Sequence, residues 1–174
     1  MRLIILRHAR TTYNEMGKLQ GRIDILPTEQ GMKDCLKVKE MLKDYPIDFV
    51  LTSPLSRAKI TASLVTDAPI LVEERLTERD LGLYEGEDPE KYDKNRYHNY
   101  YLNDTSNEVE GIREVMERVK SLLEDMKKYE DKTILWVSHG GLIRCIPYCI
   151  NGIPKDGIVL APVIKNLDFI EYTI

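Results

Sequence analysis

The sequence contains few of the residues that build disulfide frameworks and metal cages. Its three cysteines, Cys35, Cys145 and Cys149, are an odd number without CxxC spacing. Cys145 and Cys149 stand four residues apart on an expected helix face, where a thiol packs as a small apolar side chain. We therefore expect free, reduced thiols and no metal site.

The sequence also lacks long apolar runs and an excess of basic residues. The apolar run before Arg7 is too short for the core of a signal peptide, and no later run approaches the length of a membrane span. The formal net charge is -4, so the overall charge attracts neither nucleic acid nor an anionic membrane. These absences predict a soluble cytoplasmic protein in which an anionic ligand requires a local cationic pocket.

Glycine-rich nucleotide loops, repeats and linkers are absent too, and the 174 residues suit a single domain, residues 1–174. Strand-like and helix-like segments alternate along it. Expected strands cover residues 3–6, 49–52, 70–72, 133–137, 159–164 and 167–174. Expected helices cover residues 29–42, 54–64, 112–126 and 140–150, the first capped by Thr28 and the second by Ser53 before Pro54. The alternation predicts a three-layer α/β/α sandwich around a mostly parallel sheet, with one antiparallel edge strand at the carboxyl-terminal turn.

Residues 73–107 show no clean period and are rich in tyrosine and charge. A loop this long inside a compact domain is typical of a lid or binding segment, although a surface insertion remains open. His98 lies within it and has no partner pattern around it, so we expect a surface or lid residue. The tyrosines either stack on a substrate ring or cover an apolar wall of a pocket.

Polar clusters follow three of the expected parallel strands. They are Arg7-His8, the segment from Ser53 to Arg57, and Ser138-His139-Gly140-Gly141. Because ligands bind at the carboxyl ends of strands in an open α/β sheet, we expect the clusters to share one site. Arginines and histidines in one crevice repel one another unless an anion joins them. The composition therefore indicates a phosphate site, since phosphate carries nearly two negative charges and matches the planar fork of arginine.

Such a site can transfer a phosphoryl group. A neutral imidazole can attack phosphorus, neighbouring guanidinium charges oppose its protonation, and a backbone acceptor can fix its tautomer. The arginines and the second histidine then stabilise charge on the phosphoryl oxygens. A leaving alcohol also needs a proton, and Glu78, at the start of the long loop, is the candidate general acid.

These residues belong to an ordered set of motifs. The set comprises Leu6-Arg7-His8, Thr11, Asn14, Gln20-Gly21, Asp24, Ser53-Pro54-Leu55-Ser56-Arg57-Ala58, Thr61-Ala62, the segment from Glu78 to Gly86, and Ser138-His139-Gly140-Gly141. In this order and spacing it resembles the histidine phosphatase superfamily, the phosphoglycerate mutase-like proteins, from Arg2 to about Arg144. The resemblance implies the phosphoglycerate mutase-like fold.

The resemblance also implies roles for the matched residues. His8 would carry the phosphoryl group as a phosphohistidine, and Glu78 would serve as proton donor and then as base. The remaining residues would complete the phosphate pocket: Arg7, Asn14, Gln20, Gly21, Arg57, His139 and Gly140. No metal or organic cofactor is implied, the expected ligand is a small phosphorylated metabolite, and the dimers of the family leave a homodimer open.

Departures from the family pattern favour hydrolysis. Leu81 stands where mutases have a tyrosine and Gly141 where they have asparagine, and the chain lacks the arginine-rich insertion with which mutases exclude water. The motif from Ser138 to Arg144 resembles the branch of small bacterial phosphatases that includes α-ribazole phosphatases. A further departure is Ala9, which stands where the family has glycine. Glycine is favoured where the chain takes an unusual turn, so the replacement raises the question whether the backbone beside His8 keeps the family conformation.

We therefore expect a metal-independent phosphomonoesterase. One alternative is a 2,3-bisphosphoglycerate-dependent phosphoglycerate mutase, which would isomerise 3-phosphoglycerate. Another is a noncatalytic module that binds phosphoryl ligands without turnover. The physiological substrate stays open, because specificity depends on the loop at residues 87–107.

Overall fold

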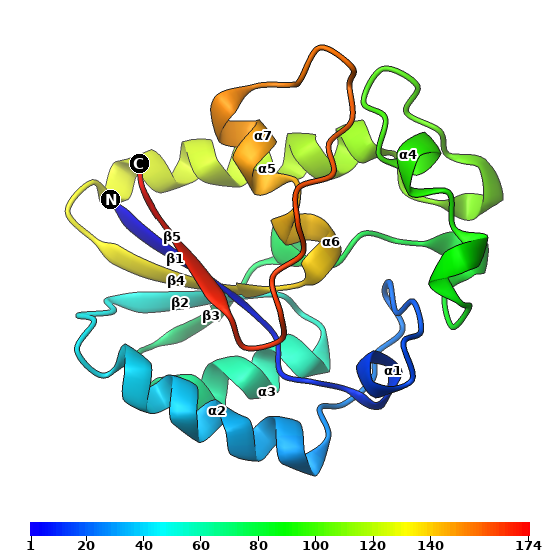
Figure 1. Ribbon diagram of the computed structural model, residues 1–174. Helices are drawn as coiled ribbons and strands as arrows, with labels where there is room; N and C mark the ends of the chain where they lie inside the picture. The colour runs from blue at the N-terminus through cyan, green and yellow to red at the C-terminus, as the bar shows by residue number, and fades with distance from the viewer.

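The structure, a computed structural model, describes residues 1–174 and centres on a five-stranded sheet with the order β3-β2-β4-β1-β5. The strands are β1 (Arg2–Arg7), β2 (Phe49–Thr52), β3 (Ile70–Val72), β4 (Thr133–Ser138) and β5 (Phe169–Thr173). Neighbours pair in parallel except β1 and β5, which are antiparallel. The predicted sheet, mostly parallel with one antiparallel edge strand, is confirmed (Figure 1).

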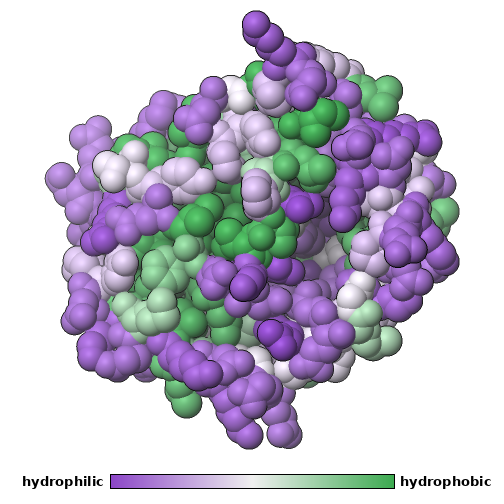
Figure 2. Space-filling model, in the orientation of Figure 1, coloured by the Kyte–Doolittle hydropathy of each residue, from purple (hydrophilic) through white to green (hydrophobic).

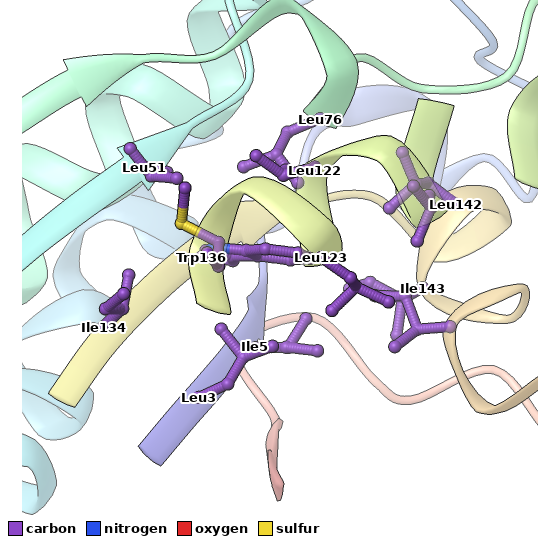
Figure 3. Packing of buried hydrophobic residues seen from close by; sticks show 13 residues of the cluster. Leu3, Ile5, Leu51, Leu76, Leu122, Leu123, Ile134, Trp136, Leu142 and Ile143 are labelled. Carbon is purple, nitrogen blue, oxygen red and sulfur yellow. The ribbon is translucent and has the colours of Figure 1, made fainter. Parts of the chain in front are cut away.

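The central strands are continuous apolar runs because both of their faces are covered. Successive side chains point to opposite faces, so Leu3 and Ile5 join Trp136 in one core cluster, whereas Ile4 and Leu6 belong to a second cluster. Figure 3 shows the first cluster, with Trp136 among leucine and isoleucine side chains. All five of these side chains are fully buried.

Helices form the two outer layers of the predicted sandwich. α2 (Glu29–Leu42) and α3 (Ser56–Val65) cover one face of the sheet, and α5 (Ile112–Met126) and α7 (Ile146–Asn151) cover the other (Figure 1). Shorter elements are α1 (Thr12–Glu15), α4 (Lys94–Tyr97), α6 (Gly140–Ile143) and the 3-10 turns η1 (Glu74–Leu76), η2 (Gly82–Tyr84), η3 (Pro89–Lys91), η4 (Ser106–Glu108) and η5 (Lys127–Tyr129). No helix combines the length and the apolar character that crossing a membrane requires.

The register of the sheet brings the carboxyl ends of β1, β2 and β4 together. Arg7 pairs with Ser138, and Thr52 pairs with Val137. The residues that follow these strands therefore leave the sheet side by side, as the motifs predict. The ring centroids of His8 and His139 lie 5.1 Å apart.

The predicted start of α3 is wrong. The helix begins at Ser56 after an N-cap at Leu55, not at Ser53 and Pro54. The hydroxyl of Ser53 is engaged by His139 at 2.7 Å instead of capping a helix. The first turn is anchored by Asp24, whose carboxylate accepts the Ser56 amide at 2.7 Å.

Two further predictions fail at prolines. The single helix expected over residues 140–150 is two helices, because Pro147 has no N–H for the carbonyl of Ile143 and its ring clashes there. The strand expected over residues 159–164 is absent. Pro162 cannot donate to a ladder, and the segment instead passes the carboxyl end of β1, where Arg7 Nη1 donates to the Ile164 carbonyl at 2.7 Å.

The long loop is packed against the domain. Tyr92 and Tyr97 stack with ring centroids 4.9 Å apart and form a buried cluster with Val109, which supports the pocket-wall alternative for the tyrosines. The surface alternative for His98 is wrong, because only 4% of it is exposed, and this loop residue lines the cavity described below. Its Nδ1–H donates to the Val159 carbonyl at 3.1 Å, and its own carbonyl accepts the Val159 amide at 2.9 Å.

Candidate active site

A cavity of about 300 Å³ opens at the carboxyl ends of the central strands. Eight of the nine site residues predicted from the sequence line it: Arg7, His8, Asn14, Gln20, Gly21, Arg57, Glu78 and Gly140. The ninth, His139, lies behind the lining. Figure 2 shows a recess right of centre that is bordered mainly by hydrophilic residues.

His8 follows β1 and is buried at the base of this cavity. Its Nδ1 lies 2.7 Å from the Ala9 carbonyl, which can only accept, so the ring carries its proton on Nδ1 and keeps a lone pair on Nε2. Burial, and then the positive charge of Arg57, holds the pKa of His8 well below its ordinary value. The imidazole is therefore neutral near pH 7, as a nitrogen nucleophile must be.

The backbone around His8 is held on both sides. The His8 amide donates to the Ser138 carbonyl at 3.0 Å, and Asn166 Nδ2 donates to the His8 carbonyl at 2.9 Å. Ala9 is fully buried, its amide donates to Thr61 Oγ1 at 2.8 Å, and its φ is not positive. The alanine that replaces the family glycine is thus accommodated without backbone strain.

Four arginines line the cavity, and none forms an ion pair with a carboxylate. They are Arg7, Arg57, Arg79 and Arg144. Elsewhere five arginines are ion-paired: Arg2, Arg22, Arg75, Arg96 and Arg118. Burial lowers the pKa of Arg7, Arg57 and Arg144, yet a guanidinium stays charged at neutral pH because its ordinary pKa exceeds about 12. The cavity is therefore strongly cationic.

Hydrogen bonds within the protein fix the orientation of the Arg57 side chain. Its Nη2 donates to the Gly21 carbonyl at 2.7 Å, and its Nε donates to His139 Nδ1 at 3.2 Å. His139 donates Nε2–H to Ser53 Oγ at 2.7 Å, so both of its ring nitrogens are engaged. Burial, and then the charge of Arg57, lowers the pKa of His139 well below its ordinary value. Neither ring nitrogen of His139 is free to contact a ligand in the cavity, so His139 acts on it through Arg57 and through its packing against the His8 ring.

Glu78 is the only carboxylate that lines the cavity. Its oxygens accept the backbone amides of Gly141 and Leu142, each at 2.9 Å, at the amino end of α6, and the amide of Arg79 at 2.8 Å. A Cβ at position 141 would lie 2.6 Å from Glu78 Oε1, so this close approach requires glycine. The three amides fix this carboxyl group inside the cationic cavity.

The remaining predicted residues shape the entrance. Asn14 Oδ1 accepts the Thr11 amide at 3.1 Å, which closes the capping box of α1. Gln20 Oε1 accepts the Thr11 hydroxyl at 2.8 Å. Gly21 has a φ of +52°, a conformation that favours glycine, and its carbonyl is the one that orients Arg57.

Sequence reasoning missed part of the lining. The missed residues include Lys18, Arg79 and Arg144, whereas Tyr92 is one of the loop tyrosines that were predicted to lie at the pocket. Arg144 could have been found, because it stands four residues after Gly140 and so shares its helix face. The position of His98 depends on the path of a loop without periodicity, which left no signal.

The three cysteines are free, and burial raises the pKa of Cys145 and Cys149 to about 12. No three His, Cys, Asp or Glu side chains converge in a way that could hold a metal ion. The cavity therefore offers a nitrogen nucleophile, guanidinium groups and one carboxyl group as its chemistry.

This fold and this cluster define an α/β protein with an anion pocket around a neutral histidine. The chain belongs to the histidine phosphatase superfamily, branch 1, whose family model matches residues 3–171. The resemblance based on the motifs is thereby confirmed.

The relatives of the chain include phosphatases. A protein of Hydrogenobacter thermophilus, provisionally named phosphoserine phosphatase 2, is 36% identical in an alignment 168 residues long that covers 90% of this chain and 82% of the relative. A phosphoserine phosphatase mutant from Entamoeba histolytica, crystallised with phosphoserine, is 26% identical with a TM-score of 0.82, covering 98% of this chain and 89% of that one. The α-ribazole phosphatase from Shigella flexneri is 27% identical with a TM-score of 0.73, covering 88% and 81%. The chain is thus an enzyme of this superfamily with phosphatase homologues.

Proposed function

We propose that the chain hydrolyses the phosphomonoester of a small metabolite through a phosphohistidine on His8, without a metal ion. The observation that carries the proposal is the His8 ring, which is buried, neutral and fixed through Nδ1, with Nε2 unpartnered beside unpaired arginines. The imidazole supplies the nucleophile and the guanidinium groups supply the charge stabilisation that phosphoryl transfer needs.

The reaction proceeds in two steps. In the first, Nε2 of His8 attacks phosphorus, the bond from phosphorus to the ester oxygen breaks, and Glu78 gives that oxygen a proton. In the second, Glu78 takes a proton from water as its oxygen attacks phosphorus, the bond from phosphorus to Nε2 breaks, and inorganic phosphate and neutral His8 are released. Arg7 and Arg57 bind the nonbridging oxygens throughout, and His139 positions Arg57.

The size of the cavity supports a small phosphorylated metabolite as substrate, because about 300 Å³ is at the lower end of ligand sites. The names of two relatives, phosphoserine phosphatase and α-ribazole phosphatase, also support a small phosphorylated metabolite as substrate. A cytoplasmic location belongs to the proposal, since three free thiols persist most readily in a reducing compartment.

A 2,3-bisphosphoglycerate-dependent phosphoglycerate mutase is the second candidate. A protein of that name from Bifidobacterium longum is 28% identical in an alignment 196 residues long that covers 90% of this chain and 80% of the relative. A mutase returns the phosphoryl group to the substrate, whereas a phosphatase passes it to water. With 3-phosphoglycerate, isomerisation to 2-phosphoglycerate supports the mutase, and release of inorganic phosphate supports the phosphatase.

The test is a phosphate-release assay over a panel of phosphomonoesters in excess chelator. We expect turnover by the parent, and a loss of about 10⁴-fold or more in His8→Ala, because the nucleophile is removed. The control is Arg10→Ala, since Arg10 is exposed and lines no part of this cavity. Turnover that requires added metal, or that survives in His8→Ala, contradicts the mechanism. Phosphate binding without turnover indicates the noncatalytic module.

A further inference from the structure

The wall of the cavity formed by the long loop carries cations that the proposed phosphoryl transfer does not use. Arg79 is 1% exposed, and its Nε and Nη2 donate to the carbonyls of Glu110 and Tyr97, each at 2.8 Å. Its Nη1 is buried without a partner, and so is Nε of Arg144. Burial, followed by the charge of Arg79 and then of Arg144, lowers the pKa of His98 to about 3, so both cations act on this wall.

The cavity holds more positive charge than one phosphate compensates. Arg7 and Arg57 balance the roughly two negative charges of a bound phosphomonoester. Arg79 and Arg144 then face a single carboxylate, Glu78, whose oxygens already accept backbone amides. One positive charge of the arginines remains, or two when Glu78 carries the proton for the leaving group, and the exposed Lys94, which forms no ion pair, adds a further one. A buried guanidinium without a counter-charge destabilises the site, and a second anionic group on the ligand removes that penalty.

We propose that Arg79 and Arg144 bind a carboxylate of the substrate, so that the enzyme selects small phosphorylated carboxylic acids. This inference rests on the phosphatase activity proposed above. A carboxylate fits because it is planar and accepts two parallel N–H bonds from an arginine fork. The hydroxyl of Tyr92, buried on the same wall without a partner, supplies a further donor. The small cavity allows only a short linker between the phosphate and the carboxylate.

His98 adds a neutral acceptor next to these donors. Its Nδ1–H is used by the Val159 carbonyl, so Nε2 keeps a lone pair on a ring that lines the cavity. An amino or hydroxyl group beside the carboxylate can donate to this nitrogen. Phosphorylated amino acids and hydroxy acids have that arrangement, and simple phosphorylated alcohols lack it.

The test compares esters that differ only in the carboxylate. O-phosphoserine is paired with O-phosphoethanolamine, and 3-phosphoglycerate with glycerol 3-phosphate, and kcat/KM is measured for each. We expect the parent to prefer the carboxylate member of a pair by about 100-fold, and Arg144→Met to lower that ratio by about 10- to 100-fold, because a charge-assisted hydrogen bond is lost. Arg144→Lys should restore part of the ratio, and Arg10→Met, outside the cavity, should leave it unchanged.

Each outcome separates the two proposals. Equal kcat/KM for both members of each pair in the parent overturns the carboxylate subsite and leaves the phosphatase intact. Absence of turnover with every ester, p-nitrophenyl phosphate included, overturns the phosphatase. An unchanged ratio in Arg144→Met overturns the residue assignment. Arg79→Met removes a fully buried side chain, so the partly exposed Arg144 carries the test if that variant does not fold.

Discussion

All three histidines of the chain are buried, which should make its stability fall steeply in acid. Burial lowers the pKa of His8 and His139 well below the ordinary value and lowers the pKa of His98 to about 3. In the unfolded chain each histidine titrates near pH 6.5. Because the folded pKa values are depressed, their contribution to stability is complete above about pH 6.5 and is lost as the pH falls below it.

The expected slope follows from counting protons. Each proton bound only by the unfolded chain lowers the free energy of unfolding by about 1.4 kcal/mol per pH unit, so three histidines give about 4 kcal/mol per unit near pH 5. Since a domain is stable by about 5–15 kcal/mol, we expect acid unfolding at about pH 5 or somewhat below. Urea unfolding followed by circular dichroism, in phosphate-free buffers between about pH 8 and pH 5, measures the slope.

The matched variant is His98→Asn, in which the asparagine amide can donate to the Val159 carbonyl in place of Nδ1–H. It removes one titrating group, so the slope should fall by about one third. A parent slope below about 1.4 kcal/mol per pH unit would show that the folded protein takes up protons on these rings, and it would refute the burial argument.

Three substitutions probe the geometry of the site. Glu78→Gln should slow alkyl phosphates by about 10²- to 10⁴-fold and p-nitrophenyl phosphate far less, because an aryl leaving group needs little protonation; equal losses in steady-state kinetics contradict a general acid. Gly141→Ala places a Cβ 2.6 Å from Glu78 Oε1, so it should reproduce that leaving-group pattern without lowering the melting temperature, and full activity on alkyl phosphates would contradict the contact. Asn166→Ala removes the donors to the His8 carbonyl at 2.9 Å and to Asn14 Oδ1 at 3.2 Å, so it should lower stability by about 1 kcal/mol and also lower kcat. An unchanged kcat in a destabilised Asn166→Ala would show that His8 is held by other contacts.

The convergence of His8 and His139 could be predicted because it depends on strong local signals. Both residues follow apolar runs that are typical of a parallel strand covered on both faces, and parallel strands place their carboxyl ends at one edge. The structure brings the two rings within 5.1 Å. What the sequence did not reveal is that His139 has both ring nitrogens engaged behind Arg57, since that depends on the side-chain partner Ser53.

The helices and the strand that were predicted wrongly contain or adjoin prolines, and the effect of a proline on an element depends on its tertiary context. Pro147 ends one helix and starts the next, whereas Pro54 precedes α3 without joining it. The positions of the loop residues in the cavity wall could not be predicted from the sequence, for a different reason. Tyr92 and His98 reach the cavity through packing among residues distant in the chain, and no periodicity records such contacts.

The phosphohistidine is the central claim, and trapping it is the most direct test. The working enzyme is mixed with a saturating phosphomonoester, quenched within milliseconds in denaturant at alkaline pH, and analysed by peptide mass spectrometry. The account predicts an acid-labile, base-stable phosphoryl adduct on the peptide that contains His8, absent from His8→Ala. Continued turnover with no adduct there, or an adduct on another residue, would contradict it.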